Sequence, residues 1–351
     1  MSDPARSPSS PAPQPTMAAS HAVGVGSPEA GDRASRAEQA RAGALAADPE
    51  AREAAAYPGA RRPDRRRTLL GHGLELAVSE WGDEGGPPIL FAHGGFDFAG
   101  TFDRFAPLIA DAGYRVVSWD QRGHGDSAHA ALYSWDADVR DMLAVLDSIG
   151  SEPIPLLGHS KGGGIAMHLI QAVPHRISRF VNIDGIPSQQ NPPDVADHDR
   201  TKLLATEISA WLDHRARAGT KVRRPDTVSG LADRRRRMNP RLSPAWLRYL
   251  VTVGARRDQD GWRWKIDPAL RPGGFGPWRA VWSLRRMVAL PVPMLAILGL
   301  ESEPMGWGTT PELARPYLPR GAELEVYEDT GHFVHIEQPE RVARRVLEFL
   351  S

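Results

Sequence analysis

Ser160 is the residue of this chain whose surroundings most clearly indicate chemistry. It is the centre of a Gly-x-Ser-x-Gly motif at 158–162, between a strand-like apolar run, Ile154 to Leu157, and a helix-like run, Ile165 to Val173. This motif between a strand and a helix is the pattern of a nucleophile elbow, a turn so tight that a side chain at either flanking position would clash. The pattern predicts covalent acyl transfer through the hydroxyl of Ser160.

His332 is the histidine best placed to activate that serine. A serine hydroxyl is inert at neutral pH until a general base takes its proton. His332 follows a glycine in the loop between a predicted strand, Glu323 to Tyr327, and the closing helix, Pro339 to Leu350. We therefore expect it at the carboxyl edge of the sheet, where Ser160 also lies. His335, three residues later, is expected to be structural.

Three carboxylates are candidates for the group that orients the base. Glu301 and Glu303 lie in the loop after the predicted strand Met294 to Leu298, and Asp184 ends the strand after the elbow helix. All three project from the carboxyl edge, and each could also be an ordinary loop carboxylate. We prefer Glu303, with Glu301 second and Asp184 third.

Backbone N–H donors for a tetrahedral oxyanion are expected from Lys161 and Gly95. The residue after the nucleophile supplies one donor through its own N–H. The loop after the strand Pro88 to Ala92 contains paired glycines that let the backbone approach a substrate closely, which favours Gly95, with Phe96 as the neighbouring alternative. The ammonium group of Lys161 either reaches solvent or a cap carboxylate, or contacts an anionic part of a substrate.

Strands and helices alternate on both sides of the elbow, which predicts a mostly parallel sheet with helices on both faces. The predicted core covers residues 64–186 and 291–351. The other strands are expected at Arg67 to Leu70, Leu74 to Trp81, Arg115 to Trp119 and Ile177 to Ile183, and the other helices at Phe102 to Ala112, Trp135 to Ile149 and Thr310 to Tyr317.

Two segments lack this alternation of strands and helices. Residues 187–290 are rich in Arg and Trp, with helix-like pieces at Thr201 to Ala216 and Pro244 to Thr252 and no convincing strand, so we expect a helical cap. Residues 1–63 are rich in Ser, Pro, Ala and Arg with few large apolar side chains, and are expected to be a disordered extension.

The composition excludes several classes of protein. Lys plus Arg and Asp plus Glu both number 43, and this zero net charge argues against a nucleic-acid binder. The basic run 234–237 has acidic neighbours and is expected to be a solvated cap surface. The absence of cysteine excludes disulfides, thiolate catalysis and cysteine-ligated metals. We expect no membrane span, no metal, no secretory signal and a cytoplasmic location.

Together these motifs resemble the α/β-hydrolase superfamily, in particular its members with a helical cap. The resemblance rests on four segments, which anchor residues 67–351: 93–95 (His-Gly-Gly), 119–127 (Trp-Asp-Gln-Arg-Gly-His-Gly-Asp-Ser), 158–163 (Gly-His-Ser-Lys-Gly-Gly) and 331–333 (Gly-His-Phe). It implies an eight-stranded, mostly parallel sheet and a triad in the order serine, acid, histidine. Ser160, Glu303 and His332 follow that order, although the acid of this family is more often Asp.

The predicted activity is cleavage of a small carboxylic ester, thioester or lactone through an acyl-enzyme on Ser160, as in carboxylesterases, without a cofactor. In this fold a serine nucleophile argues against epoxide hydrolase and dehalogenase chemistry. Acyl transfer, C–C bond hydrolysis and perhydrolysis remain open on the same triad. A non-enzymatic ligand-binding homologue remains open as well.

Overall fold

The structure of the chain, a computed structural model, describes residues 30–188, 222–270 and 280–351, together with the isolated helical residues 205, 208, 209, 212, 213, 216 and 217. None of the described helices is long and apolar enough to cross a membrane.

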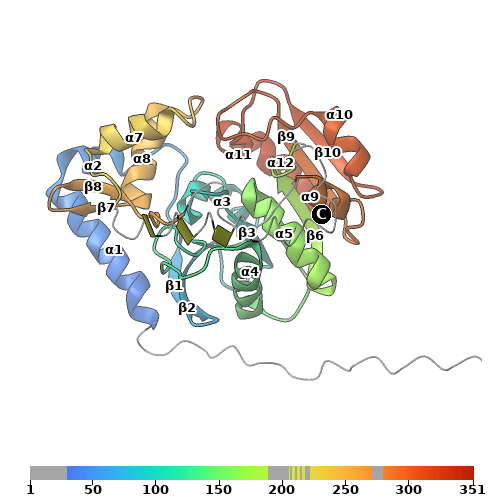
Figure 1. Cartoon of the computed structure of the whole chain (residues 1–351), viewed down its shortest axis with the longest axis horizontal. Helices are drawn as coiled ribbons and strands as arrows, with labels where there is room; N and C mark the ends of the chain where they lie inside the picture. Colours follow the sequence, from blue (N-terminus) through green and yellow to red (C-terminus); the bar gives the residue numbers. More distant parts are fainter. Residues whose placement is uncertain are drawn as a thin grey trace, which may run out of the picture.

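An eight-stranded sheet forms the centre of the molecule (Figure 1). Its strand order is β1-β2-β4-β3-β5-β6-β9-β10; β2 is antiparallel to β1 and β4, and all other neighbours are parallel. This arrangement confirms the predicted fold. The strands are β1 (Arg65–Gly71), β2 (Leu74–Trp81), β3 (Pro88–Ala92), β4 (Arg115–Trp119), β5 (Ile154–His159), β6 (Ile177–Ile183), β9 (Met294–Gly299) and β10 (Glu323–Tyr327).

Helices cover both faces of the sheet. One face carries α4 (Trp135–Ile149), α5 (Lys161–Ala172) and α9 (Ala280–Met287), and the other carries α3 (Ala106–Ala110) and α12 (Pro339–Leu350). The shorter elements are η1 (Ala99–Phe102), η2 (Pro174–Arg176), α10 (Pro311–Ala314), η4 (Arg315–Tyr317) and α11 (Val334–Glu337).

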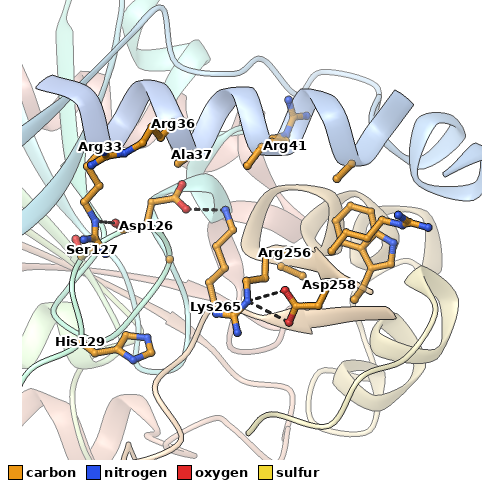
Figure 2. A pocket seen from close by; sticks show the side chains of 16 residues that line it. Arg33, Arg36, Ala37, Arg41, Asp126, Ser127, His129, Arg256, Asp258 and Lys265 are labelled. Carbon is orange, nitrogen blue, oxygen red and sulfur yellow. Dashed lines mark hydrogen bonds and ion pairs between the residues drawn. The ribbon is translucent and has the colours of Figure 1, made fainter. Parts of the chain in front are cut away.

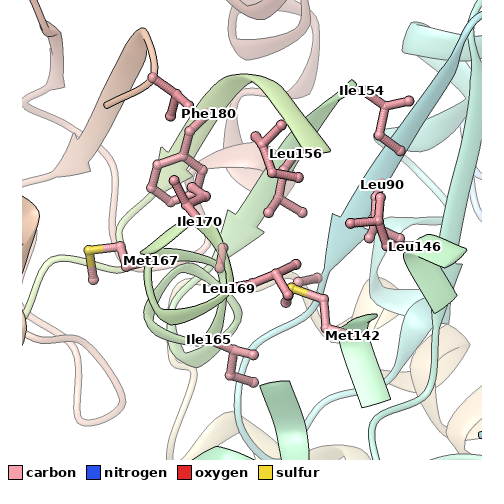
Figure 3. Close-up of a cluster of buried hydrophobic side chains, with 14 of the residues drawn as sticks. Leu90, Met142, Leu146, Ile154, Leu156, Ile165, Met167, Leu169, Ile170 and Phe180 are labelled. Carbon is pink, nitrogen blue, oxygen red and sulfur yellow. The ribbon is translucent and has the colours of Figure 1, made fainter. Parts of the chain in front are cut away.

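Apolar side chains on both faces of the central strands explain the two helical layers. In β3, Leu90 packs in the cluster that contains α4 and α5, whereas Ile89 and Phe91 pack in the cluster that contains α3 and α12. Figure 3 shows Leu90 and Leu156 of the sheet facing Met142, Ile165 and other side chains of the first cluster. Because side chains alternate along a strand, each central strand must be apolar throughout to bury both faces.

The predicted cap contains a β-hairpin as well as helices. Its described elements are α7 (Val228–Arg236), α8 (Pro244–Gly254), β7 (Ala255–Asp258) and β8 (Gly261–Trp264). The predicted end of the cap at residue 290 is wrong, because α9 packs on the main sheet with α4 and α5. The expectation of no strand there was wrong, because these strands are short and Arg-rich and are held by each other rather than by the main sheet. Of the predicted helix at Thr201 to Ala216, only residues 205, 208, 209, 212, 213 and 216 are described, and these are helical.

The expected disorder of residues 1–63 is wrong for residues 30–54, which form α1 (Ala30–Ala47) and α2 (Pro49–Ala54). Alanines have high helix propensity, and Ala51 and Ala54 are buried against aromatic side chains of the cap, including Trp246. Asp48 caps α2 and also accepts a hydrogen bond from Trp262 Nε1 at 2.7 Å. In Figure 1 these helices lie beside α7, α8 and the hairpin. The large apolar partners are supplied by the cap, so the composition of the segment alone was misleading.

Replacing Asp48 tests whether these helices are docked on the cap. Asp48→Ala removes an N-cap and the acceptor of Trp262, and should lower the free energy of unfolding by about 2 kcal/mol in urea titrations. Asp48→Asn keeps one acceptor oxygen for the N-cap but places an amide NH2 against the indole N–H of Trp262, so it should lose about 1 kcal/mol, about half the effect of Asp48→Ala. Equal urea midpoints for Asp48→Ala and the wild type would contradict the docking.

Candidate active site

Ser160 occupies a strained turn between β5 and α5. Its backbone has φ 52° and ψ −123°, and its N–H donates to the carbonyl oxygen of Ile183 at 3.0 Å. A Cβ at Gly158 would lie 2.6 Å from the Cα of Gly163, and one at Gly162 would overlap the carbonyl oxygen of Ala92. Glycine is therefore required on both sides of the serine.

Backbone strain is concentrated around this serine. Four non-glycine residues of the described chain have a positive φ, and three of them are Phe96, Ser160 and Asp184. These residues follow β3, β5 and β6, which are neighbours in the sheet. Positive φ in non-glycine residues costs free energy and is enriched at functional sites. The carboxyl ends of these three strands therefore define the candidate site.

His332 is fixed by three hydrogen bonds. Its backbone N–H donates to Glu303 Oε2 at 2.7 Å, and its carbonyl oxygen accepts a hydrogen bond from His159 Nε2 at 3.0 Å. Its ring Nδ1–H donates to Asp184 Oδ2 at 2.5 Å. With the proton on Nδ1, Nε2 is the basic nitrogen of the ring, as a general base requires.

The carboxylate at the ring is Asp184, the third candidate, and this corrects the preference for Glu303. Glu303 contacts the backbone of His332 rather than its imidazole. Glu301 is half-exposed and lies 3.6 Å from Arg241. The reason is side-chain direction: the carboxylate of Asp184 reaches the ring Nδ1, whereas that of Glu303 is turned to the backbone N–H of the same histidine.

Asp184 is itself held in place on both sides. Its N–H donates to the carbonyl oxygen of Ile297 at 2.8 Å, and its Oδ1 accepts from the N–H of Gly299 at 3.3 Å. Both partners belong to β9, the next strand of the sheet. A signal in the sequence was available, because Asp184 directly follows the strand after the elbow helix.

The loop after β3 lies directly against Ser160 and Lys161. A Cβ at Gly94 would lie 3.3 Å from Ser160 Cβ, and one at Gly95 would lie 3.5 Å from Lys161 Cδ. The N–H of Phe96 donates to His124 Nε2 at 3.1 Å and is therefore already engaged. Of the two alternatives for the second oxyanion donor, this geometry favours Gly95 over Phe96.

The side chain of Lys161 is buried and points into the protein. Its Nζ lies 2.8 Å from Asp138 Oδ2 and donates to Gln121 Oε1 at 2.9 Å. Burial lowers the pKa of Lys161, and the carboxylate of Asp138 opposes that shift. The expectation of solvent or a cap carboxylate as the surroundings of this ammonium is wrong, because its partner Asp138 is buried and belongs to α4 of the core.

Gln121 connects Lys161 to the glycine loop. Its backbone N–H donates to His93 Nε2 at 2.9 Å, and its side-chain Nε2 donates to the carbonyl oxygen of His93 at 2.5 Å. His93 directly precedes Gly94, so the ammonium supports the loop through two residues.

Four buried histidines near the site have lowered pKa values. Burial lowers the pKa of His93 and of His335 to about 3, and lowers the pKa of His159 and His124 well below the ordinary value. Near neutral pH these four rings therefore add no positive charge beside the candidate base. Across the described ranges, no group of three or more His, Cys, Asp or Glu side chains could hold a metal ion.

Comparison with known proteins identifies the family. Residues 87–339 match the family described as alpha/beta hydrolase fold. The sn-1-specific diacylglycerol lipase ABHD11 of Mus musculus is 27% identical over 278 residues, covering 77% of this chain and 83% of the lipase. A serine hydrolase-like protein of Dictyostelium discoideum is 34% identical over 122 residues, but the match covers 33% of this chain and 34% of that protein.

A solved structure agrees in fold. The thioesterase domain from the curacin biosynthetic pathway superposes with a TM-score of 0.69 at 23% identity, covering 81% of this chain and 99% of the domain. Sheet, elbow and sequence match lead to one conclusion, and the predicted resemblance is confirmed: this chain belongs to the α/β-hydrolase family.

Proposed function

We propose that this α/β hydrolase cleaves carboxylic esters, with Ser160 as nucleophile, His332 as general base and Asp184 as the acid that orients the base. The observation that carries the proposal is the 2.5 Å contact between His332 Nδ1 and Asp184 Oδ2 beside the strained elbow of Ser160. A carboxylate on Nδ1 fixes the ring tautomer and stabilises the imidazolium that forms when the serine is deprotonated.

The proposed reaction has two steps. His332 takes the proton of Ser160 while the serine oxygen attacks the carbonyl carbon, and the imidazolium then gives that proton to the departing alcohol. The same imidazole then deprotonates a water molecule that attacks the acyl carbon, and the imidazolium returns the proton to the oxygen of Ser160 as the carboxylic acid leaves. The N–H groups of Gly95 and Lys161 are the proposed oxyanion donors.

The names of the relatives support an ester as substrate. The relative from Mus musculus is named a diacylglycerol lipase, and another, of Mycobacterium tuberculosis and 33% identical over 141 residues, is named lipase LipV. Both names refer to cleavage of carboxylic esters. We extend that substrate class, and not a particular lipid, to this chain.

Labelling with a fluorophosphonate probe tests the nucleophile. Intact-mass analysis should find one adduct on the wild-type chain and none on Ser160→Ala, because only an activated serine attacks the phosphorus. A folded wild-type protein without an adduct would contradict the proposal. An adduct that persists on Ser160→Ala would identify a different nucleophile.

Kinetics of two matched variants test the acid. Asp184→Asn should lower kcat for p-nitrophenyl acetate by about 10³–10⁴-fold, because the amide no longer favours the required imidazole tautomer. Glu303→Gln still offers an acceptor oxygen to the N–H of His332 and should change kcat by less than about tenfold. A larger loss of kcat in Glu303→Gln than in Asp184→Asn would identify Glu303 as the acid of the triad.

Substitutions of the buried ion pair test the support of the glycine loop. Lys161→Met leaves the charge of Asp138 buried without its partner and should lower the free energy of unfolding by about 3–5 kcal/mol. Lys161→Met combined with Asp138→Leu removes both charges and should recover most of that stability. The double variant should still have a kcat about tenfold below the wild type, less than the about 10²–10³-fold loss of an oxyanion donor.

The comparison requires urea titration and kinetics on the same preparations. Wild-type kcat in a stable double variant would show that Lys161 does not support the loop that carries Gly95.

A further inference from the structure

A cavity of about 530 Å³ lies apart from Ser160, Asp184 and His332 (Figure 2). Its walls are α1 on one side and the β7–β8 hairpin on the other, and its floor is the loop 125–127 after β4. Cavities that hold small molecules commonly have volumes of about 300–1,000 Å³. The proposed hydrolysis does not use this space.

The sequence of α1 explains why the cavity exists. Ala37, Ala40 and Ala44 line it at helical spacing, and alanine side chains are too short to fill the space up to the hairpin. Arg33 and Arg41 line it from the same helix (Figure 2), and each is paired with a carboxylate, Arg33 with Glu75 at 2.8 Å and Arg41 with Glu38 at 3.0 Å. The α1 wall of the cavity is therefore polar, and Glu38 and Glu75 offset part of its positive charge.

Cationic side chains outnumber acidic ones in the lining. The cationic set is Arg33, Arg36, Arg41, Arg256, Arg257 and Lys265, and the acidic set is Asp126 and Asp258. Asp126 is already engaged, because its carboxylate lies 2.7 Å from Lys265 and 2.8 Å from Arg66. Burial raises the pKa of Asp126, but these two cations hold it well below its usual range.

Guanidinium groups from both walls keep donors for a ligand. A guanidinium has five N–H donors, whereas the hydrogen bonds of Arg33 use two and those of Arg256 use only Nε. Arg257 is 41% exposed, and its nearest carboxylate, Asp48, is 3.9 Å away. An anion with several oxygens could therefore bridge α1 and the hairpin.

His129 lies at the edge of the cavity, beside the arginines of both walls. Its imidazole is half-exposed, and its pKa is lowered by burial and by the charges of Arg256 and Arg33, with Asp267 opposing.

We propose that this cavity binds a small molecule that carries a phosphate group. Arginine forks match the oxygens of a phosphate in a bidentate geometry, and here they come from two facing walls. The source is either an inorganic phosphate or an organic phosphate ester, since both present the same oxygens. The site is separate from the ester-cleaving centre and does not depend on it.

Isothermal titration of the full chain with inorganic pyrophosphate and with ADP tests the proposal. The wild type should bind one equivalent of at least one of them, and Ser160→Ala should bind equally well. Arg256→Ala with Arg257→Ala should weaken binding by about tenfold or more. The control is Arg236→Ala with Arg237→Ala, which removes the same charge from exposed positions outside the cavity and should leave binding unchanged.

A third variant tests whether binding needs the space of the cavity as well as its cationic side chains. Ala40→Trp fills the space without removing a cation, and should abolish binding while circular dichroism confirms the fold. Tighter binding of ADP indicates a phosphate ester, and tighter binding of pyrophosphate indicates an inorganic anion. The proposal is overturned if neither ligand binds at up to about 1 mM, if both double variants lose affinity equally, or if Ala40→Trp binds like the wild type.

Discussion

Close packing of backbone against backbone at the elbow is the constraint on which the rest of the site depends. The segment after Ser160 passes so near the end of β3 that Gly162 can carry no side chain, and the N–H of Ser160 is held by the last residue of β6. Three adjacent strands therefore end at one point. The loops that follow them place Gly95, Ser160 and Asp184 together. His332 is supplied by the loop after β10, the strand at the edge of the sheet.

The loop 120–127 supplies a second layer of support behind that point. Asp120 Oδ1 accepts the N–H of Ala99 at 2.8 Å, and His124 accepts the N–H of Phe96, so the segment after β3 is held at both of these positions. These groups are buried, and a buried polar group is tolerable only when it is hydrogen-bonded. The buried ammonium of Lys161 belongs to this network through Gln121, which explains why a lysine directly after the nucleophile does not face solvent.

Local patterns predicted most of the fold but not the identity of the acid. The bounds of Leu74–Trp81, Pro88–Ala92 and Ile177–Ile183 were predicted as the structure has them, because apolar runs ending at turn residues are local signals. The choice between Asp184 and Glu303 depends on which carboxylate is directed at the ring of His332, and that direction is set by contacts between residues far apart in the sequence. The helices of residues 30–54 were missed for the same reason, since their apolar partners lie some 200 residues later in the chain.

The N-terminal helices contact the cap, and the cap in turn contacts the loop that carries Gly95. Asp48 holds Trp262 of the hairpin, and Arg41 Nε donates to the carbonyl oxygen of Thr252 at the end of α8. From the same cap, Arg235 donates to Asp97 at 2.5 Å, two residues after Gly95. Burial raises the pKa of Asp97 and Arg235 opposes that shift, so separating the cap from the loop would leave a carboxylate buried without its partner. The cost of that separation ties the position of the cap to the geometry of the glycine loop.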